Sequence, residues 1–302
     1  MHYSKRFIKI VNNFFINHSV FLKRFVDKKK TFKNKKILIA GGAGSIGSIL
    51  AIKLLEYDVK EIVIIDNNEY SIHRFKRLEF DKNKITIKFL SIMNQKELEK
   101  NFKRYKFDIV YNCAAIKHVD IAEDNKEETH RVNVIGTRKI VALSKKYKVK
   151  QIVFISSDKA FYPKGVMGKT KLKAEKEVLK INDNNLKTKV LRFPNVLFSS
   201  GSLLEIINES ILTKSTFFLK DKNLKRFFIF KKDTLEFILR ATELNLSNKI
   251  IVLNNVKEVK ILKLLNNLKK FYKLKIKISK LPKYEKISEV YSDFSSKNKF
   301  FL

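Results

Sequence analysis

The segment Lys36-Ile-Leu-Ile-Ala-Gly-Gly-Ala-Gly-Ser-Ile-Gly47 decides the fold of this chain. A short apolar run, typical of a buried strand, leads directly into glycines spaced as G-x-x-G-x-x-G, and the amphipathic stretch Ser48–Leu55 follows. A strand, a glycine-rich turn and a helix in this order are characteristic of the loop that binds the diphosphate of a dinucleotide. A plain strand-to-helix turn would not need glycines at these spacings.

Each glycine of the motif has an expected task. Gly41 would permit the tight turn, Gly44 would let the diphosphate approach the backbone, and Gly47 would let the helix pack closely on the strand. Ser45 and Ile46, in the same loop, are expected cofactor ligands, and the N-terminus of the helix that follows would face the phosphates. The chain has only 8 glycines in 302 residues, so their concentration in this segment is informative.

The next apolar run ends at Asp66, at the distance expected for the acid that binds the adenosine ribose hydroxyls. Such an acid would repel a 2′-phosphate, so the sequence favours NAD over NADP, with NADP still possible. Asp66 could equally cap a helix that starts in the sequence Asp66-Asn67-Asn68. The two interpretations are compatible.

Short apolar runs then alternate with longer helical patterns. The expected strands are Ile37–Ala40, Ile62–Ile65, Ile85–Phe89, Ile109–Tyr111, Ile152–Ile155, Val190–Leu191 and, later, Ile250–Leu253. The expected helices lie near 46–57, 69–79, 95–103, 127–147 and 167–180. This alternation predicts an α/β fold with a Rossmann-like, doubly wound parallel sheet. We expect an NAD-binding domain over 34–195 and a smaller C-terminal substrate-binding cap over 196–302.

Residues 1–33 form a segment of different character. Apolar residues recur at roughly helical spacing among Lys and Arg, namely Phe7, Ile8, Val11, Phe14, Phe15, Phe21, Leu22 and Phe25. The longest uncharged run, Ile10–Leu22, is shorter than the ~20 residues that span a bilayer. The segment predicts an amphipathic helix that packs on the domain or a partner subunit, or that lies at a membrane surface.

Composition limits the class of protein. The formal net charge is +35, but Lys is scattered through the whole chain, which indicates compositional bias more than a nucleic-acid-binding face. We therefore expect no nucleic-acid partner. The single cysteine, Cys113, cannot form an internal disulfide or a metal cluster, and we interpret it as a buried strand residue. We expect a cytoplasmic protein, either free or at the inner face of the membrane, and no metal.

Four motifs in the right order carry a family resemblance: Asn112–Val119, Asn133–Thr137, Ile155–Ala160 and Val166–Lys171. The chain resembles the nucleotide-sugar 4,6-dehydratase branch of the polysaccharide biosynthesis family, within the extended short-chain dehydrogenases. The similarity runs from about Lys36 to Arg226, with a weaker echo at Pro282–Glu289.

The resemblance implies a reaction on a nucleotide-activated sugar, with UDP-N-acetylglucosamine as the expected substrate. Carbon 4 is oxidised by bound NAD+, water leaves from carbons 5 and 6, and the stored hydride returns to carbon 6. By resemblance, Lys159 is the base for carbon 5, Asp158 the acid for the departing hydroxyl, and Ser157 a hydrogen-bond donor to the carbon 4 oxygen. A helix-capping Asp beside a solvated Lys is the alternative interpretation.

The pair Met167 and Lys171 occupies the place of the Tyr-x-x-x-Lys pair of short-chain dehydrogenases. By resemblance, Lys171 holds the nicotinamide ribose. A thioether cannot accept a proton, so Met167 leaves the acceptor for the carbon 4 proton unassigned, and Tyr162 is the nearest phenol in sequence. The membrane-bound branch of the family resembles this chain in having Met there.

Further contacts are implied by resemblance. The expected cofactor ligands beyond the glycine loop are Ala114, Ala115, Lys117 and Asn133, and the expected substrate ligands are Lys117, His118, Asn195 and Arg226. A guanidinium suits the diphosphate task of Arg226 better than an ammonium does. A homo-oligomer is also implied.

Some positions depart from the family pattern. Ser91 stands where an Asp that contacts adenine is usual, Ala40 replaces a Thr, and Pro282–Lys286 matches only faintly. These departures leave two alternatives open. One is a nucleotide-sugar epimerase, and the other is a non-catalytic scaffold that binds a dinucleotide.

Overall fold

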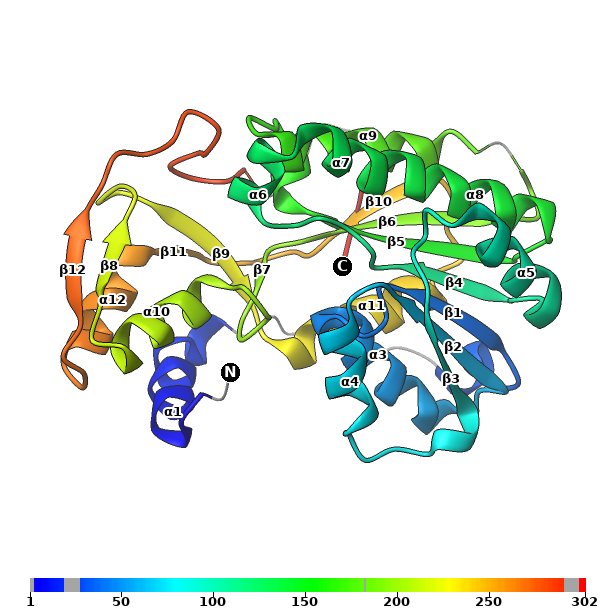
Figure 1. Ribbon diagram of the computed structural model, residues 1–302, viewed down its shortest axis with the longest axis horizontal. Helices are drawn as coiled ribbons and strands as arrows, with labels where there is room; N and C mark the ends of the chain where they lie inside the picture. The colour runs from blue at the N-terminus through cyan, green and yellow to red at the C-terminus, as the bar shows by residue number, and fades with distance from the viewer. Residues whose placement is uncertain (1–2, 19–27, 182, 291–298) are drawn as a thin grey trace.

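The structure is a computed structural model that describes residues 3–18, 28–181, 183–290 and 299–302. Within these ranges the main feature is an eight-stranded sheet in which every hydrogen-bonded pair of strands is parallel. Its order is β3-β2-β1-β4-β5-β6-β10-β13 (Figure 1). The strands are β1 (Lys36–Ala40), β2 (Glu61–Asp66), β3 (Ile85–Phe89), β4 (Ile109–Asn112), β5 (Gln151–Ser157), β6 (Lys187–Phe193), β10 (Lys249–Val252) and β13 (Lys299–Phe301).

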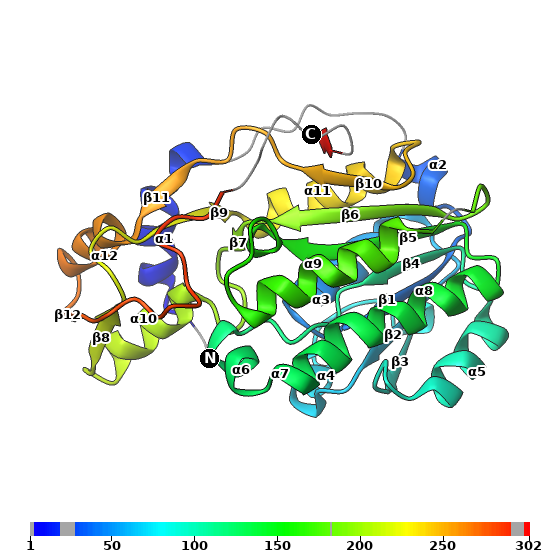
Figure 2. The ribbon, with the colours of Figure 1, turned by 90° about the horizontal axis from the view of Figure 1, so that it is seen from above.

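Helices cover both faces of this sheet (Figures 1 and 2). One face carries α2 (Lys28–Phe32), α3 (Ser45–Leu54), α4 (Glu69–Lys76) and α11 (Lys231–Glu243). The other carries α5 (Gln95–Tyr105), α8 (Thr137–Lys146) and α9 (Val166–Leu179). Along β1, Ile37 and Ile39 enter one core while Leu38 and Ala40 enter the other. Because both faces are buried, the strands read as continuous apolar runs, and the expected doubly wound α/β fold is confirmed.

The expected helices and strands are present, with one change of detail. The single helix expected near 127–147 is divided into α7 (Lys126–His130), a π-helical turn over Arg131–Gly136, and α8. A further short helix, α6 (Val119–Asp124), precedes it. Cys113 lies one residue beyond β4 and is half-buried, so its interpretation as a buried strand residue is wrong in detail.

A smaller lobe lies beside the carboxyl ends of the strands (Figure 1). Its helices are α1 (Lys5–Phe14), α10 (Leu203–Leu212) and α12 (Ile261–Lys269). Its strands form two small sheets, one of β7 (Asn195–Val196), β9 (Lys225–Ile229) and β11 (Glu258–Lys260), the other of β8 (Thr216–Leu219) and β12 (Lys275–Ile278). A separate apolar core fills this lobe, with Phe15, Leu204, Phe217, Leu264 and Leu268 among its buried residues.

The chain crosses between the two lobes more often than a division at residue 195 implies. Helix α11 packs on α3 and β6, and β10 pairs with β6 in the large sheet. The last strand, β13, then pairs with β10. The segment 196–302 therefore supplies most of the smaller lobe and also β10 and β13, the two strands at one edge of the large sheet. Helix α11, from the same segment, packs on β6.

The N-terminal segment packs on the smaller lobe. Helix α1 buries Phe7, Ile10 and Val11 in the core that it shares with α12. The sequence predicted one amphipathic helix through 1–33, whereas α1 ends at Phe14 and a 3₁₀ turn follows at Ile16–His18. Phe21, Leu22 and Phe25 lie outside the described residues. In the part of the chain that is described, no helix has the length and apolar character needed to cross a bilayer.

Candidate active site

The glycine-rich loop lies where the strand order reverses. Strand β1 has β2 on one side and β4 on the other, so the loops after β1 and β4 border a crevice of the kind that binds ligands in open α/β sheets. Gly41 has a φ of +69°, and a Cβ there would lie 2.7 Å from the Ala114 backbone nitrogen. A Cβ on Gly47 would lie 2.6 Å from the Gly41 oxygen. Both positions therefore require glycine, as the motif predicted.

Asp66 at the end of β2 fixes this loop. One carboxylate oxygen accepts from the Ala43 nitrogen at 3.1 Å and the other from the Asn68 nitrogen at 3.0 Å. The side chain of Asn68, and not that of Asp66, caps α4 by accepting from the Ser71 nitrogen. Asp66 is thus placed beside the glycine loop, where the sequence predicted a ribose ligand.

The segment after β4 is held by Asn133 from the π-helical turn. Its amide accepts from the Ile116 nitrogen at 2.8 Å and donates to the Ile116 oxygen at 3.0 Å and to the Thr170 hydroxyl at 3.1 Å. The extra residue of a π turn aims Asn133 at this segment while α8 continues beyond it. Asn133 therefore orders the stretch that contains Ala114, Ala115 and Lys117, which is an organising role.

Two titratable residues of that stretch face the crevice. Burial lowers the pKa of the Lys117 amine, and burial together with the Lys117 charge lowers the pKa of the His118 imidazole. The Lys117 amine donates to the Ser200 carbonyl at 2.5 Å. His118 packs against Gly201, so both residues contact the loop that leads into the smaller lobe.

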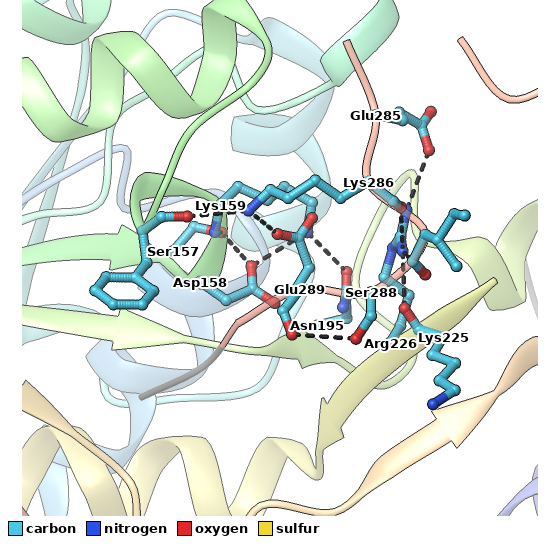
Figure 3. Close-up of polar contacts among 12 residues, drawn as sticks. Ser157, Asp158, Lys159, Asn195, Lys225, Arg226, Glu285, Lys286, Ser288 and Glu289 are labelled. Carbon is cyan, nitrogen blue, oxygen red and sulfur yellow. Dashed lines mark hydrogen bonds and ion pairs between the residues drawn. The ribbon is translucent and has the colours of Figure 1, made fainter. Parts of the chain in front are cut away.

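Ser157, Asp158 and Lys159 cluster at the carboxyl end of β5 (Figure 3). The Ser157 hydroxyl donates to Asp158 Oδ1 at 2.8 Å, and the Lys159 amine lies 3.2 Å from the same oxygen. The Lys159 amine also lies 3.4 Å from Asn195 Oδ1 in β7. Asp158 is fully buried, and among the described residues its Oδ2 has no hydrogen-bond partner. The alternative interpretation expected a solvated Lys159, whereas the Lys159 side chain is only 19% exposed and pairs with Asp158.

Lys171 lies one turn beyond Met167 on α9, and both side chains are buried. The Lys171 amine donates to the Ile155 carbonyl at 2.8 Å, and burial lowers its pKa to about 8. The polar partners of the Lys159 amine are Asp158 and Asn195. Tyr162 is 66% exposed, and its ring packs on that of Phe161 at an interplanar angle of 60°, so its phenol lies outside the buried cluster.

Arg226 on β9 holds the closing segment, residues 285–289 of the smaller lobe, which contacts the loop after β5 (Figure 3). Its guanidinium donates to the Lys286 and Ile287 carbonyls, and it pairs with the Glu285 carboxylate at 3.1 Å. Lys220 pairs with the same carboxylate. The sequence assigned the Arg226 guanidinium to a diphosphate, but here it is paired with the Glu285 carboxylate. A diphosphate that binds Arg226 would have to displace Glu285.

Sequence reasoning missed two ion pairs near the cluster. Lys286 bridges Glu289, at 2.5 Å, and the Phe161 carbonyl, at 2.9 Å, so it ties the closing segment to the loop after β5 (Figure 3). Arg192 forms a buried bidentate pair with Glu175, at 2.9 and 2.6 Å. Glu175 and Arg192 lie 17 positions apart on α9 and β6, so no spacing within one element signals this pair.

The residues present fit a dinucleotide. The loop after β1 leaves no room for side chains at Gly41 and Gly47, and α3 begins directly after it with Gly44 as its N-cap. The helix N-terminus offers free backbone N–H groups to a diphosphate, with Ser45 and Ile46 as its first residues. At the position of the missing adenine-contacting acid, the Ser91 hydroxyl accepts from the Met93 nitrogen.

Comparison with known proteins identifies the family. A family model described as "Polysaccharide biosynthesis protein" matches residues 37–292. This chain belongs to the polysaccharide biosynthesis protein family.

Family relatives include enzymes that modify nucleotide sugars. The capsular polysaccharide biosynthesis protein CapD of Staphylococcus aureus is 34% identical over 78% of this chain and 40% of its own length. A UDP-N-acetylglucosamine 4,6-dehydratase (inverting) of Campylobacter jejuni is 31% identical over 70% of this chain and 64% of its own. A UDP-glucose 4-epimerase of Rickettsia canadensis is 28% identical over 70% and 64%. The chain thus spans less than two thirds of the length of each of these three relatives.

Solved structures share the fold of this family member. Pen from Bacillus thuringiensis superposes with a TM-score of 0.79 at 25% identity, over 85% of this chain and 82% of that one. DesIV, a dTDP-glucose 4,6-dehydratase from Streptomyces venezuelae with NAD bound, gives a TM-score of 0.76 at 16% identity, over 85% and 88%. At that identity the second likeness concerns the fold alone.

Proposed function

We propose that this family member is a nucleotide-sugar 4,6-dehydratase that uses a nicotinamide dinucleotide, with UDP-N-acetylglucosamine as substrate. The observation that carries the proposal is the buried cluster in which the Lys159 amine and the Ser157 hydroxyl share one oxygen of Asp158. An acid, a base and a hydroxyl thus meet at the carboxyl end of β5, the edge where open α/β sheets bind substrates. The Campylobacter relative acts on UDP-N-acetylglucosamine.

Each residue of the cluster has a separate task in the proposal. Lys159 removes the proton on carbon 5, and Asn195, 3.4 Å from its amine, orients it. Asp158 protonates the hydroxyl that leaves carbon 6. Among the described residues the Asp158 Oδ2 atom has no hydrogen-bond partner, so the proposal assigns this atom to the leaving hydroxyl.

Ser157 hydrogen-bonds the oxygen on carbon 4. Met167 cannot take the proton of that hydroxyl, since a thioether is not a base at neutral pH. The Ser157 hydroxyl already donates to Asp158 at 2.8 Å, so the proton can pass through Ser157 to Asp158. Asp158 would then hold the proton that it later gives to the leaving hydroxyl. Lys159 would return a proton to carbon 5 when the hydride returns to carbon 6, which balances the cycle.

The cofactor supplies reversible oxidation of carbon 4 when it is bound. The glycine loop with Ser45 would hold its diphosphate, Asp66 its adenosine ribose, and Lys171 its nicotinamide ribose. The Lys171 amine is pinned to the Ile155 carbonyl, so it enters the site in a fixed orientation. We propose NAD in preference to NADP, because the Asp66 carboxylate lies beside the glycine loop.

The test is product analysis. The purified protein is incubated with NAD+ and, in separate reactions, with UDP-N-acetylglucosamine, UDP-glucose and dTDP-glucose. The products are separated and their masses are measured by mass spectrometry. A product lighter by one water from UDP-N-acetylglucosamine supports the proposal. An isomer of unchanged mass would establish the epimerase instead, and no conversion of any sugar by a protein that binds NAD would favour the scaffold.

A further inference from the structure

The loop 198–202, between β7 and α10, spans the crevice at the reversal of strand order. The Ser200 nitrogen donates to the Ser45 hydroxyl at 2.9 Å, and the Ser200 carbonyl accepts from the Lys117 amine at 2.5 Å. Ser45 opens α3 after β1, whereas Lys117 follows β4, the neighbouring strand. One peptide segment from the smaller lobe thus hydrogen-bonds both walls of the crevice.

Two further contacts fix this loop in place. Gly201 has a φ of +66°, and a Cβ there would lie 1.9 Å from His118 Cε1, so the imidazole packs directly on the glycine backbone. The Gly201 N–H donates to the carboxylate of Glu205, in the first turn of α10. Phe198 also has a left-handed backbone, with a φ of 58°. A non-glycine residue in that region is costly, so the loop is held by its contacts against local strain.

We propose that residues 198–202 form a strap that closes the dinucleotide site and limits how fast the dinucleotide enters and leaves. The inference rests on the proposed function. A dinucleotide in the crevice lies between Ser45 and Lys117, so exchange requires the two hydrogen bonds of Ser200 to break. In a cycle that returns the cofactor to its starting state, a closed site retains it from one turnover to the next.

Glu205 acts as the positioning residue of the strap. Its carboxylate reaches the strap from α10, and its hydrogen bond to Gly201 is charge-assisted. Removing the carboxylate frees one anchor of the strap, and it also removes the charge that Glu205 exerts on Lys117 and His118, while the hydrogen bonds of the glycine loop and of the β5 cluster stay in place. Glu209, one turn further along α10 and exposed, provides a matched control.

The experiment measures NADH binding by stopped-flow fluorescence in the wild type and in Glu205→Ala, Gly201→Ala and Glu209→Ala. A strap that closes the site slows both the entry and the exit of the dinucleotide. We therefore expect association and dissociation rates both to rise about tenfold in Glu205→Ala and Gly201→Ala, the factor lost with one charge-assisted hydrogen bond, while Kd changes less. Glu209→Ala should match the wild type.

The outcomes separate the strap from the proposed function. Unchanged rates in both strap variants, or a faster dissociation with an unchanged association rate, would overturn the strap, because a simple contact affects release alone. A wild type that binds no dinucleotide would overturn both proposals. If the binding rates change as expected but the protein dehydrates no nucleotide sugar, the proposed function is overturned and the strap proposal is retained.

Discussion

Asp66 joins two tasks at one residue. Its carboxylate fixes the glycine loop through the Ala43 nitrogen, and it lies where the adenosine ribose of a dinucleotide is expected. An anion at this position raises the free energy of a bound 2′-phosphate, because like charges a few Å apart repel. The cofactor preference should therefore depend on this single charge.

The prediction concerns Asp66→Asn. The wild type should bind NADH at least about tenfold more tightly than NADPH, which corresponds to about 1.4 kcal/mol. Asn keeps an oxygen that can accept from the Ala43 nitrogen but removes the charge, so the preference should shrink. Titration of tryptophan-free protein with each fluorescent dinucleotide measures both constants. An unchanged ratio would show that Asp66 does not face the ribose.

At the residue scale the sequence predicted most of the site because motifs are local. The glycine loop and the Ser157–Lys159 triplet are contiguous, and their chemistry can be read from a short stretch. The Arg226–Glu285 pair and the contact of Lys286 with the Phe161 carbonyl could not be read in this way. Arg226 meets Glu285 across 59 positions of sequence, and this proximity depends on how the smaller lobe folds.

At the element scale, one buried ion pair attaches α9 to the sheet. Arg192 in β6 and Glu175 in α9 are each less than 5% exposed at the side chain, and the Ser156 hydroxyl in β5 donates to the same carboxylate. The Arg192 guanidinium also lies over the Phe161 ring. The pair therefore positions α9, which carries Lys171, relative to the end of β5.

We predict that Glu175→Ala lowers the free energy of unfolding by about 3–5 kcal/mol, since it leaves the Arg192 charge buried without this carboxylate. The control is Glu177→Ala on the same helix, whose partner Arg138 is 56% exposed at the side chain, and which should cost about 1 kcal/mol or less. Urea denaturation measures both. Equal losses in the two variants would contradict the assignment.

A buried lysine attaches α11 to β6. The Lys189 amine donates to the Thr242 and Leu244 carbonyls at the end of the helix, at 2.9 and 2.5 Å. Burial, with the Lys187 charge, lowers the pKa of Lys189 to about 7. Between pH 7 and 10.5 the unfolded chain therefore binds more protons at this position than the folded chain does.

The Lys189 contribution to the free energy of unfolding should rise as pH increases from about 7 to 10.5, by roughly 3–5 kcal/mol, because the folded state no longer holds a buried charge. Urea denaturation across this range should show a rise that Lys189→Met reduces. Identical pH profiles for the wild type and the variant would refute the depressed pKa.

The helices and strands of the large lobe were predictable because burial on both faces leaves a clear pattern. The return of β10 and β13 to the large sheet was not, because a short apolar run such as Ile250–Leu253 does not reveal its neighbour. The same limit applies to β8 and β12, which pair across more than fifty positions of sequence. The periodicity of apolar residues indicates which residues are buried, whereas the pairing of strands depends on the whole fold.

At the scale of the whole molecule, the N-terminal helix belongs to the smaller lobe. Phe7 is buried in the core that α1 shares with α12, stacks on Tyr3 and contacts the ring of Tyr272. The apolar face that could have entered a membrane surface is therefore covered by protein. The two sequence-based alternatives for the described part of this segment make different predictions.

Phe7→Ala should lower the free energy of unfolding by about 3–5 kcal/mol, the usual cost of removing a buried phenylalanine. Ile16→Ala is the control, because Ile16 is 68% exposed and should be nearly neutral. Chemical denaturation, with vesicle flotation alongside, separates the alternatives. A Phe7→Ala protein of normal stability that loses binding to anionic vesicles would instead support the membrane helix.

The central claim is that Lys159 is the base of a dehydration at carbons 5 and 6 of a nucleotide sugar. The most direct test is mass spectrometry of UDP-N-acetylglucosamine after incubation with the protein and NAD+ in deuterated water. We predict loss of one water with deuterium incorporated, a rate about 10²–10⁴-fold lower in Lys159→Ala, and a normal rate in Lys169→Ala, an exposed lysine on α9. Dehydration at the wild-type rate in Lys159→Ala, or a product of unchanged mass from the wild type, would contradict the claim.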